Sequence, residues 1–460
     1  MIPANTLKEI SRIVGPRHLY TEQDALSEYA SDGTKLQFMP DAVAFPANDE
    51  EISRIFLLAN REYFPVIPRG GGSGMSGGTL PVKGGLILAM ERLDRILRID
   101  RDNLTATVEP GVITARFQEE VEKLDLFFPP DPASADMSTI GGNVAECAGG
   151  LRGLKYGVTR DYVMGLTVVL PSGEKIKTGG GTVKGVAGYD LTRLLVGSEG
   201  TLAVITSVTL RLIPKPAVKK TMIAFFSKLL SAGETVSRII GEKIVPVTLE
   251  LLDRLCISCV REDIVLDIPE DTSAILLIEV DGDEPIVSRD TGRIREICEQ
   301  SGAILFKIAW EPKEADALWE VRRKVSPSLM KLRPNKVSED VVVPRNRVPE
   351  LISFLEKLGE KAGLPIPAFG HAGDGNIHVN IMMDKALPEE VRKGEQAVRE
   401  LFQKVIDLGG TITGEHGIGI TKAPYLEMEF PQPTLDLMKR IKGAFDPGGI
   451  LNPGKIFMYA

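Results

Sequence analysis

Glycine-rich segments constrain this chain more than any other feature of its sequence. The first is PRGGGSGMSGG, residues 68–78, which directly follows the extended run FPVI. Glycine allows positive φ angles and close backbone approach, so successive N–H groups can converge on an anion such as a pyrophosphate. The spacing is neither that of a Walker loop nor that of a strand–GxGxxG–helix unit. Alone, the segment fits either a phosphate cradle or a flexible turn.

Two further segments favour the cradle. DPASADMSTIGGNVAECAGG, residues 131–150, combines hydroxyl side chains, paired glycines and a run of small residues. That combination suits a backbone that packs against a flat ring or a diphosphate. GYDLTRLLVGSEGTLAVIT, residues 188–206, places the small turn GSEGT immediately before a predicted strand. Three such segments in one stretch of chain are difficult to explain as turns alone.

The length predicts more than one domain. A chain of 460 residues exceeds what one compact core usually holds, so two or three domains are expected. Early helical patterns and later short β-type runs predict an α+β domain, and a boundary is expected at residues 213–220, where IPKPAVKK places two prolines among charges. Beyond it, long helical patterns alternate with the strand-like runs AILLIEV and ILFKIAW. These predict a second α+β domain.

Charge and cysteine content exclude several classes of function. Lysine and arginine number 55 against 63 acidic residues, and the net charge of −8 disfavours nucleic acid as the main partner. No apolar run approaches the roughly 20 residues of a transmembrane helix, and the N-terminus does not resemble a signal peptide. Of four cysteines only Cys256 and Cys259 have CxxC spacing, and they lie in a predicted amphipathic helix. A structural role for them and a cytoplasmic location are therefore expected.

Three of the four histidines occur in two glycine-flanked motifs. GHAGDGNIHVN contains His371 and His378, and GEHGIG contains Glu415 and His416. The alternation in NIHVNIMM predicts a strand with His378 on one face, whereas His371 is expected on a flexible loop before it. Two imidazoles and a carboxylate are a common ligand set for Zn²⁺ or Fe²⁺ that leaves positions open for a substrate. The alternative is a set of hydrogen-bonding histidines in glycine-rich turns.

A basic segment lies between the two groups of motifs. On the helix predicted within ALWEVRRKVSPSLMKLRPNK, Arg322 and Ser326 are four residues apart and share a face, and Lys336 follows a proline-containing turn. An arginine suits a substrate carboxylate, and a lysine adds a compact positive charge. A solvated basic helix is the alternative reading.

In this order, the glycine-rich segments resemble the FAD-binding domain of the vanillyl-alcohol oxidase and p-cresol methylhydroxylase superfamily. Within it, the chain resembles the flavin subunit of glycolate oxidase and the D-lactate and D-2-hydroxyglutarate dehydrogenases. The resemblance covers nearly the whole chain and implies an α+β protein. It implies a FAD-binding domain over residues 1–215, a substrate or cap domain with a metal site over 216–425, and a C-terminal segment, 426–460, that packs back on the FAD domain.

The resemblance also assigns the residues that bind FAD. The first loop wraps the pyrophosphate, the second segment follows the diphosphate and the ring, and the third supplies a turn and its strand. The residues implied are Pro68, Arg69, Gly70, Gly71, Gly72, Ser73, Gly74, Met75, Pro130, Ser134, Ser138, Thr139, Gly141, Gly142, Asn143, Ala148, Gly150, Gly200, Thr201, Ile205 and Asn452. The first loop has no histidine or cysteine where covalent relatives attach their flavin, so non-covalent FAD is expected.

The same resemblance implies a metal site and a base. His371, His378 and Glu415 are the implied ligands of a divalent metal, for which zinc is favoured and iron and manganese are alternatives. His416 is the implied base, and Arg322, Ser326 and Lys336 approach the substrate. The expected reaction oxidises a small D-2-hydroxy acid to the 2-oxo acid, with D-lactate favoured over glycolate and D-2-hydroxyglutarate.

The expected partners follow from the same family. An iron–sulfur subunit or an electron-transfer flavoprotein is the implied electron acceptor, through which the chain could associate with a membrane, and a homodimer stays open. Two other functions stay open as well: an oxidase that uses oxygen directly, and a flavin-carrying, non-catalytic subunit of a larger redox complex.

Overall fold

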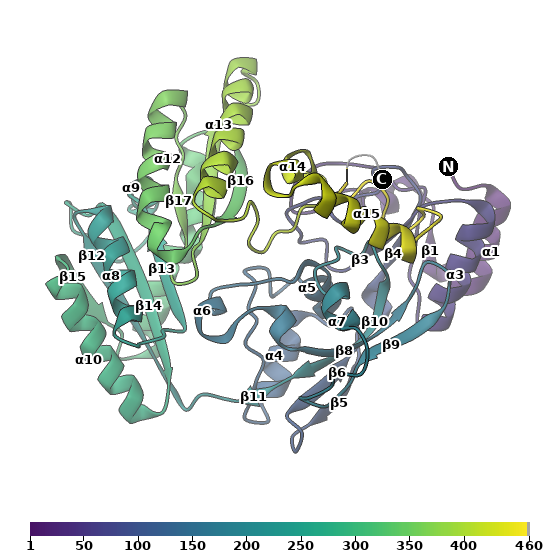
Figure 1. Ribbon diagram of the computed structural model, residues 1–460, viewed down its shortest axis with the longest axis horizontal. Coiled ribbons are helices and arrows are strands. Elements are labelled where there is room, and N and C mark those ends of the chain that lie inside the picture. Colours follow the sequence, from purple (N-terminus) through teal and green to yellow (C-terminus); the bar gives the residue numbers. More distant parts are fainter. Residues whose placement is uncertain (458–460) are drawn as a thin grey trace. The chain divides into compact units, whose positions relative to one another are not determined.

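The computed structural model describes residues 1–457 and divides the chain into two compact units (Figure 1). Unit 1 comprises residues 1–149, 158–215 and the segment from Glu415 onward, and unit 2 comprises residues 150–157 and 216–414. The family resemblance implies that the returning segment starts at residue 426. It begins earlier because Ile418 and Ile420 donate backbone hydrogen bonds to Glu199 and Ser76 of unit 1.

The first sheet of unit 1 has the strand order β1-β2-β4-β3, in which only the β1/β2 pair is antiparallel. Helix α3 begins after Asn48, whose side chain accepts a hydrogen bond from the N–H of Glu51. Three acidic residues in the first turn stabilise the helix further, because their negative charges lie at the positive end of the helix dipole. Helices α1 and α3 pack together, and Ile10 and Phe56 are fully buried in the core beside this sheet (Figure 1). The elements are α1 (Ala4–Val14), β1 (Leu19–Tyr20), α2 (Gln23–Ser27), β2 (Ala42–Ala44), α3 (Asp49–Glu62), β3 (Val66–Arg69) and β4 (Leu86–Ala89).

The second sheet of unit 1 is antiparallel, with the order β5-β6-β10-β8-β9. Buried and partly exposed residues alternate along its central strand β10, so Val208 and Leu210 face the core. Helix α5 packs against β10, and α7 packs against β8 and β9. The elements are β5 (Ile96–Asp100), β6 (Thr105–Val108), α4 (Thr114–Glu122), β7 (Leu126–Phe127), α5 (Ile140–Glu146), β8 (Val163–Val169), β9 (Lys175–Gly179), α7 (Leu191–Leu195), β10 (Val204–Arg211) and β11 (Ile213–Pro214), with β7 and β11 paired separately.

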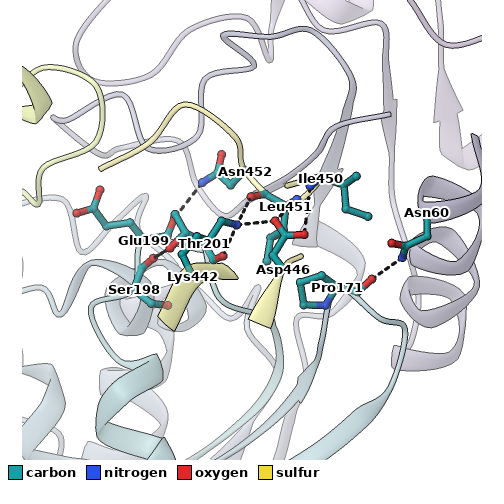
Figure 2. Close-up of polar contacts among 10 residues, drawn as sticks. All are labelled: Asn60, Pro171, Ser198, Glu199, Thr201, Lys442, Asp446, Ile450, Leu451 and Asn452. Carbon is teal, nitrogen blue, oxygen red and sulfur yellow. Dashed lines mark hydrogen bonds and ion pairs between the residues drawn. The ribbon is translucent and has the colours of Figure 1, made fainter. Parts of the chain in front are cut away.

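The C-terminal segment completes unit 1. It contains α14 (Leu426–Glu429) and α15 (Gln432–Phe445), and Leu451 forms a parallel bridge with Val66 of β3. Lys442 Nζ is largely buried and donates to the carbonyl oxygens of Thr201 (2.7 Å) and Leu451 (2.8 Å) and to the Asp446 carboxylate (2.6 Å), as Figure 2 shows. These contacts fasten the end of the described chain to the turn before β10.

Unit 2 is built on a seven-stranded antiparallel sheet with the order β15-β12-β14-β13-β17-β18-β16. Every residue of β18 is buried, as are those of β13, so these two strands lie inside the unit. The strands are β12 (Val218–Phe226), β13 (Thr248–Leu252), β14 (Ala274–Gly282), β15 (Ala303–Ile308), β16 (Asn335–Val342), β17 (Ala368–His371) and β18 (Asn376–Met383). The helices are α6 (Gly153–Tyr156), α8 (Leu229–Gly241), α9 (Arg254–Val260), α10 (Glu284–Gln300), α11 (Pro312–Ser328), α12 (Val348–Ala362) and α13 (Pro388–Asp407).

The CxxC pair lies in α9, as the sequence predicts. Cys256 and Cys259 are buried in a hydrophobic cluster, and Asp253 caps the helix by accepting a hydrogen bond from the N–H of Cys256. Burial raises the pKa of the Cys256 thiol well above its ordinary value. The pair therefore serves the core of unit 2.

Candidate functional site

The loop after β3 packs directly against the second glycine-rich segment. A Cβ at Gly70 would lie 2.4 Å from Thr139 Oγ1, and a Cβ at Gly71 would lie 2.1 Å from the carbonyl oxygen of Met137. No side chain fits at either place without moving its neighbour. Glycine is therefore required where these two loops meet.

Gly72 and Gly74 of the same loop differ in their surroundings. Gly72 has a φ of +66°, and a Cβ there would lie 2.2 Å from a terminal nitrogen of Arg69. At Gly74 a Cβ would have no atom of residues 1–457 within 4 Å apart from those of its chain neighbours. Gly72 thus shapes the loop, whereas Gly74 presents bare backbone to empty space.

The second segment is held by polar side chains. Thr139 caps α5 and accepts a hydrogen bond of 3.2 Å from the N–H of Gly142. Asn143 is buried and donates to Thr114 Oγ1 at 2.7 Å. A Cβ at Gly141 would lie 2.4 Å from the ring of Pro110. These contacts fix backbone that faces the first loop.

The loops enclose a cavity of about 370 Å³ within unit 1. Most of the predicted cofactor residues line it: Pro68, Arg69, Gly70, Gly71, Gly72, Ser73, Gly74, Met75, Ser134, Ser138, Thr139, Gly141, Gly142, Asn143, Ala148, Gly200 and Ile205. The cavity is therefore walled by all three glycine-rich segments.

Four predicted cofactor residues lie outside the cavity wall. The carbonyl oxygen of Pro130 accepts a hydrogen bond from Gln118, and the hydroxyl of Thr201 donates to the carbonyl oxygen of Ser198. Gly150 belongs to unit 2. Asn452 is buried, and its amide group donates to the carbonyl oxygens of Gly78 and Glu199, at 2.9 Å each. Asn452 therefore connects the C-terminal segment to two of the glycine-rich loops. A motif comparison finds the same residue whether it supports the loops in this way or contacts the ligand directly.

Several residues that sequence reasoning missed also line the cavity. They include two carboxylates, and the set is Gly78, Thr79, Met90, Pro110, Pro132, Ala133, Ala145, Glu146, Gly149, Glu199, Ala203 and Val204. Apart from Met90 and Pro110, each lies within four positions of a predicted residue in the chain, and that proximity is the signal that could have found them. Met90 and Pro110 come from other parts of unit 1 and carried no such signal.

Glu199 is the most constrained of these residues. Its carboxylate is buried and accepts hydrogen bonds from the N–H groups of Ile418 (2.8 Å) and Gly419 (2.6 Å). Burial raises the pKa of Glu199, and the two N–H donors lower it by less. Figure 2 shows Glu199 beside Asn452, which holds its carbonyl group. The GSEGT turn is thus joined both to GEHGIG and to the C-terminal segment.

Glu415 and His416 line the cavity of unit 1 as well. Glu415 follows Gly414, the last residue of unit 2, whose N–H donates to Asp340. Both residues lie in irregular backbone, and the next residue, Gly417, has a φ of +79°. Successive residues of a regular strand point to opposite faces, so this irregular backbone is what allows Glu415 and His416 to line the same cavity.

His371 and His378 lie together in unit 2. His371 is the last residue of β17 and not part of a flexible loop, because β17 pairs with both β13 and β18 and the turn begins only after it. His378 is in β18, and the two ring centroids are 5.2 Å apart. The ring of His378 also lies 5.3 Å from that of Phe369. Both imidazoles are buried, with 5% and 8% of the residue surface exposed.

A buried carboxylate contacts both a histidine and an arginine in unit 2. Glu250 of β13 is hydrogen-bonded to Nδ1 of His371, and its other oxygen accepts from Nε of Arg322 at 2.5 Å. Burial alone would raise the pKa of Glu250, but its interactions with His371 and Arg322 lower it to about 2. The guanidinium of Arg322 lies over the ring of Phe369, 4.4 Å from its centroid. The predicted substrate arginine is therefore held from two sides.

The other two predicted substrate residues contact each other. Ser326 is one turn after Arg322 in α11, as expected, and Lys336 is in β16. Lys336 Nζ donates to the hydroxyl of Ser326 at 2.7 Å. Within unit 2 the structure thus pairs Ser326 with Lys336 and Arg322 with Glu250.

Comparison with known proteins agrees with this geometry. Residues 40–179 match the family model described as FAD binding domain, and residues 215–456 match that of FAD linked oxidases, C-terminal domain. The chain belongs to the FAD-linked oxidase family.

Two relatives and one solved structure show how far the likeness extends. The chain is 46% identical to glycolate oxidase subunit GlcD of Bacillus subtilis (strain 168), covering 99% of this chain and 97% of that protein. It is 35% identical to a D-lactate dehydrogenase of Archaeoglobus fulgidus, covering 98% of each. A crystal structure of p-cresol methylhydroxylase matches with a TM-score of 0.80 at 17% identity, covering 99% of this chain and 96% of that one.

These matches confirm the family and the α+β fold of the p-cresol methylhydroxylase type that the sequence predicts. The family is one of FAD-linked oxidoreductases, so the chain is an enzyme that uses FAD. No helix in residues 1–457 combines the length and apolar character needed to cross a membrane.

Proposed function

We propose that this enzyme is a dehydrogenase that oxidises a small D-2-hydroxy acid to the 2-oxo acid. D-lactate is favoured, and glycolate and D-2-hydroxyglutarate are the alternatives. The relatives named as a glycolate oxidase subunit and a D-lactate dehydrogenase support this substrate class. The observation that carries the proposal is the grouping of His371 and His378 with a paired arginine on neighbouring elements of unit 2.

The lining of the cavity of unit 1 supports FAD as the cofactor, and we expect the FAD to be bound non-covalently. Gly74 presents backbone to this cavity, and beyond its chain neighbours no atom of the described residues lies within 4 Å of a Cβ built there. The first loop contains neither histidine nor cysteine. We expect the loops at residues 70–75 and 138–143 to hold the diphosphate, because their glycines bring N–H groups close to an anion.

His371, His378 and Glu415 are the side chains that would hold a divalent metal, and their types fit zinc, with iron or manganese as alternatives. Glu415 is one residue beyond Gly414, whose N–H is anchored on Asp340, and Asp340 pairs with His378 across β16 and β18. Chain connectivity therefore supports Glu415 as the third ligand. When bound, FAD accepts the electron pair of the oxidation, and the metal acidifies the substrate hydroxyl.

Substrate binding and proton removal are assigned to side chains of the protein. Arg322 and Lys336 bind the substrate carboxylate, because a guanidinium and an ammonium supply complementary charge, and Ser326 orients Lys336 through their hydrogen bond. His416 removes the proton of the 2-hydroxyl group as a general base. Its place in the cavity wall of unit 1 supports this role.

The electrons must then leave the enzyme. We propose transfer to a partner in the cytoplasm, either an iron–sulfur subunit or an electron-transfer flavoprotein; the description of the Bacillus subtilis relative as a subunit supports a partner. The same description favours, as a second candidate, a flavin-carrying subunit without activity of its own.

One experiment separates these functions. Under anaerobic conditions, D- and L-2-hydroxy acids are added to the purified protein and the visible flavin absorbance is followed. We expect bleaching by D-lactate and not by L-lactate. Bleaching by no acid would favour the non-catalytic subunit, and stoichiometric peroxide in air would favour an oxidase.

A further inference from the structure

Glu250 is a glutamate at the centre of an otherwise apolar strand. It lies in the middle of β13, TLELL, between β14 and β17, and no part of its side chain is exposed. Burial of a carboxylate is unfavourable unless charged partners and hydrogen bonds compensate for the lost water. A residue that serves only the core would be apolar here, as Leu251 and Leu252 are.

The sheet register fixes Glu250 opposite His371. The two residues are direct partners in the antiparallel pair of β13 and β17, so their side chains leave the same face side by side. One carboxylate oxygen is hydrogen-bonded to Nδ1 of His371. The ring nitrogen of His371 that can face a metal is then Nε2. This hydrogen bond selects the tautomer and the ring orientation that a metal ligand needs.

The other carboxylate oxygen fixes Arg322. It accepts a hydrogen bond of 2.5 Å from Nε, and the guanidinium lies over the ring of Phe369. Because the ion pair uses Nε, it does not consume the two terminal amino groups. Those groups are the fork that binds a carboxylate with two parallel hydrogen bonds.

We propose that Glu250 is a positioning residue that orients His371 for the metal and Arg322 for the substrate carboxylate. This inference rests on the proposed function, in which His371 is a ligand and Arg322 binds substrate. The carboxylate of Glu250 then acts on both ends of the substrate. It acts on the hydroxyl group through the metal ligand His371, and on the substrate carboxylate through Arg322. Loss of its charge should weaken both.

The test is Glu250→Gln, which keeps the size and shape of the side chain and removes its charge. Zinc affinity is measured in chelator-buffered solutions, and FAD content and thermal unfolding are measured on the same samples. We expect zinc affinity to fall by about 10- to 100-fold, the usual effect of losing an outer partner of a metal ligand, at unchanged FAD content. The absorption spectrum of the cobalt-substituted protein should also change, because it reports ligand orientation.

The effect of Glu250 on Arg322 is measured separately, through the steady-state kinetics of the variant. At zinc concentrations that saturate the variant, we expect KM for the 2-hydroxy acid to rise by about 10-fold, more than kcat falls, because the guanidinium loses its fixed orientation. Glu250→Asp retains the charge on a shorter arm and should recover part of the zinc affinity. This second variant keeps the test decisive if the glutamine variant folds poorly.

Glu279→Gln is the matched control. Glu279 is a buried glutamate on the adjacent strand β14, and its carboxylate accepts hydrogen bonds from Thr221 and Trp319. We expect it to alter stability without altering zinc affinity. Equal zinc affinity in wild type and Glu250→Gln would overturn the role of Glu250 and leave the proposed function intact. A wild-type protein that binds no metal would instead overturn the metal site and, with it, this inference.

Discussion

Oε2 of Glu199 accepts a hydrogen bond of 2.6 Å from the N–H of Gly419, a residue 220 positions later in the chain. The second carboxylate oxygen accepts from Ile418 in the same way, so the turn before β10 holds the backbone that follows His416. The position of His416 in unit 1 therefore depends on a carboxylate that no recognised motif assigned to it.

Replacing Glu199 should damage this connection. Glu199→Gln keeps the size but directs an NH₂ group at one of the two N–H donors, which leaves a buried donor unsatisfied at a cost of about 1–3 kcal/mol. We expect a lower unfolding temperature and a lower FAD content after gel filtration. Glu174→Gln, on an exposed carboxylate that accepts from Ser172, is the control and should change neither. Wild-type FAD content and stability in Glu199→Gln would show that the carboxylate charge is dispensable.

Two glycines of the first loop allow the effect of a substitution on the fold of the loop to be distinguished from its effect on FAD binding. A Cβ at Gly74 is uncrowded among residues 1–457, so we expect the apoprotein of Gly74→Val to keep its stability while FAD occupancy falls, because the valine occupies space proposed for the cofactor. Gly72→Val should lower both, since its φ is +66° and Arg69 occupies the space. Gly180→Val, equally uncrowded but outside the cavity wall, is the control. Full occupancy in Gly74→Val would remove this loop from the FAD site.

The two histidines of the proposed mechanism should respond differently to substitution. His378→Ala removes one of three ligands, so metal and activity should be lost together while FAD stays bound. His416→Asn removes only a proton acceptor, so metal and FAD should stay while anaerobic flavin reduction slows by roughly 10² to 10⁴. Metal analysis and stopped-flow reduction distinguish the two. Loss of metal in His416→Asn would make His416 a ligand.

We expect Lys455 to make the free energy of unfolding depend on pH in the alkaline range. Burial lowers the pKa of Lys455 to about 8 from its ordinary 10.5, and the residue is 3% exposed. Between these values the unfolded chain binds more protons than the folded protein, so the free energy of unfolding rises with pH by up to about 1.4 kcal/mol per unit. Urea unfolding of wild type and Lys455→Met should therefore differ by about 1–3 kcal/mol more in favour of wild type near pH 10 than near pH 8. A pH-independent difference would contradict the shifted pKa.

The sequence predicted those features of the structure that depend on neighbouring residues or on a recognisable motif. Strand β18 followed from the alternation in NIHVNIMM, and helix α9 followed from the amphipathic pattern around Cys256 and Cys259. His371 was misplaced because a glycine-rich stretch looks like a loop when the strands that pair with it are unknown. Glu250 was missed for a related reason. Its partner His371 is 121 residues away, and one polar residue in an apolar strand gives no sign of which side chain it will meet.

The closure of unit 1 by its last segment has a consequence for biosynthesis. The N–H of Val66 donates to Ile450, and the carbonyl oxygen of Val66 accepts from Asn452, so β3 obtains these partners only after the whole of unit 2 has left the ribosome. Until then a nascent chain displays an unpaired strand edge, the kind of surface that invites mispairing with other chains. Unit 2 is nearly continuous in sequence and has no such delay. Chaperone demand during synthesis should therefore concentrate on the flavin-binding half of the molecule.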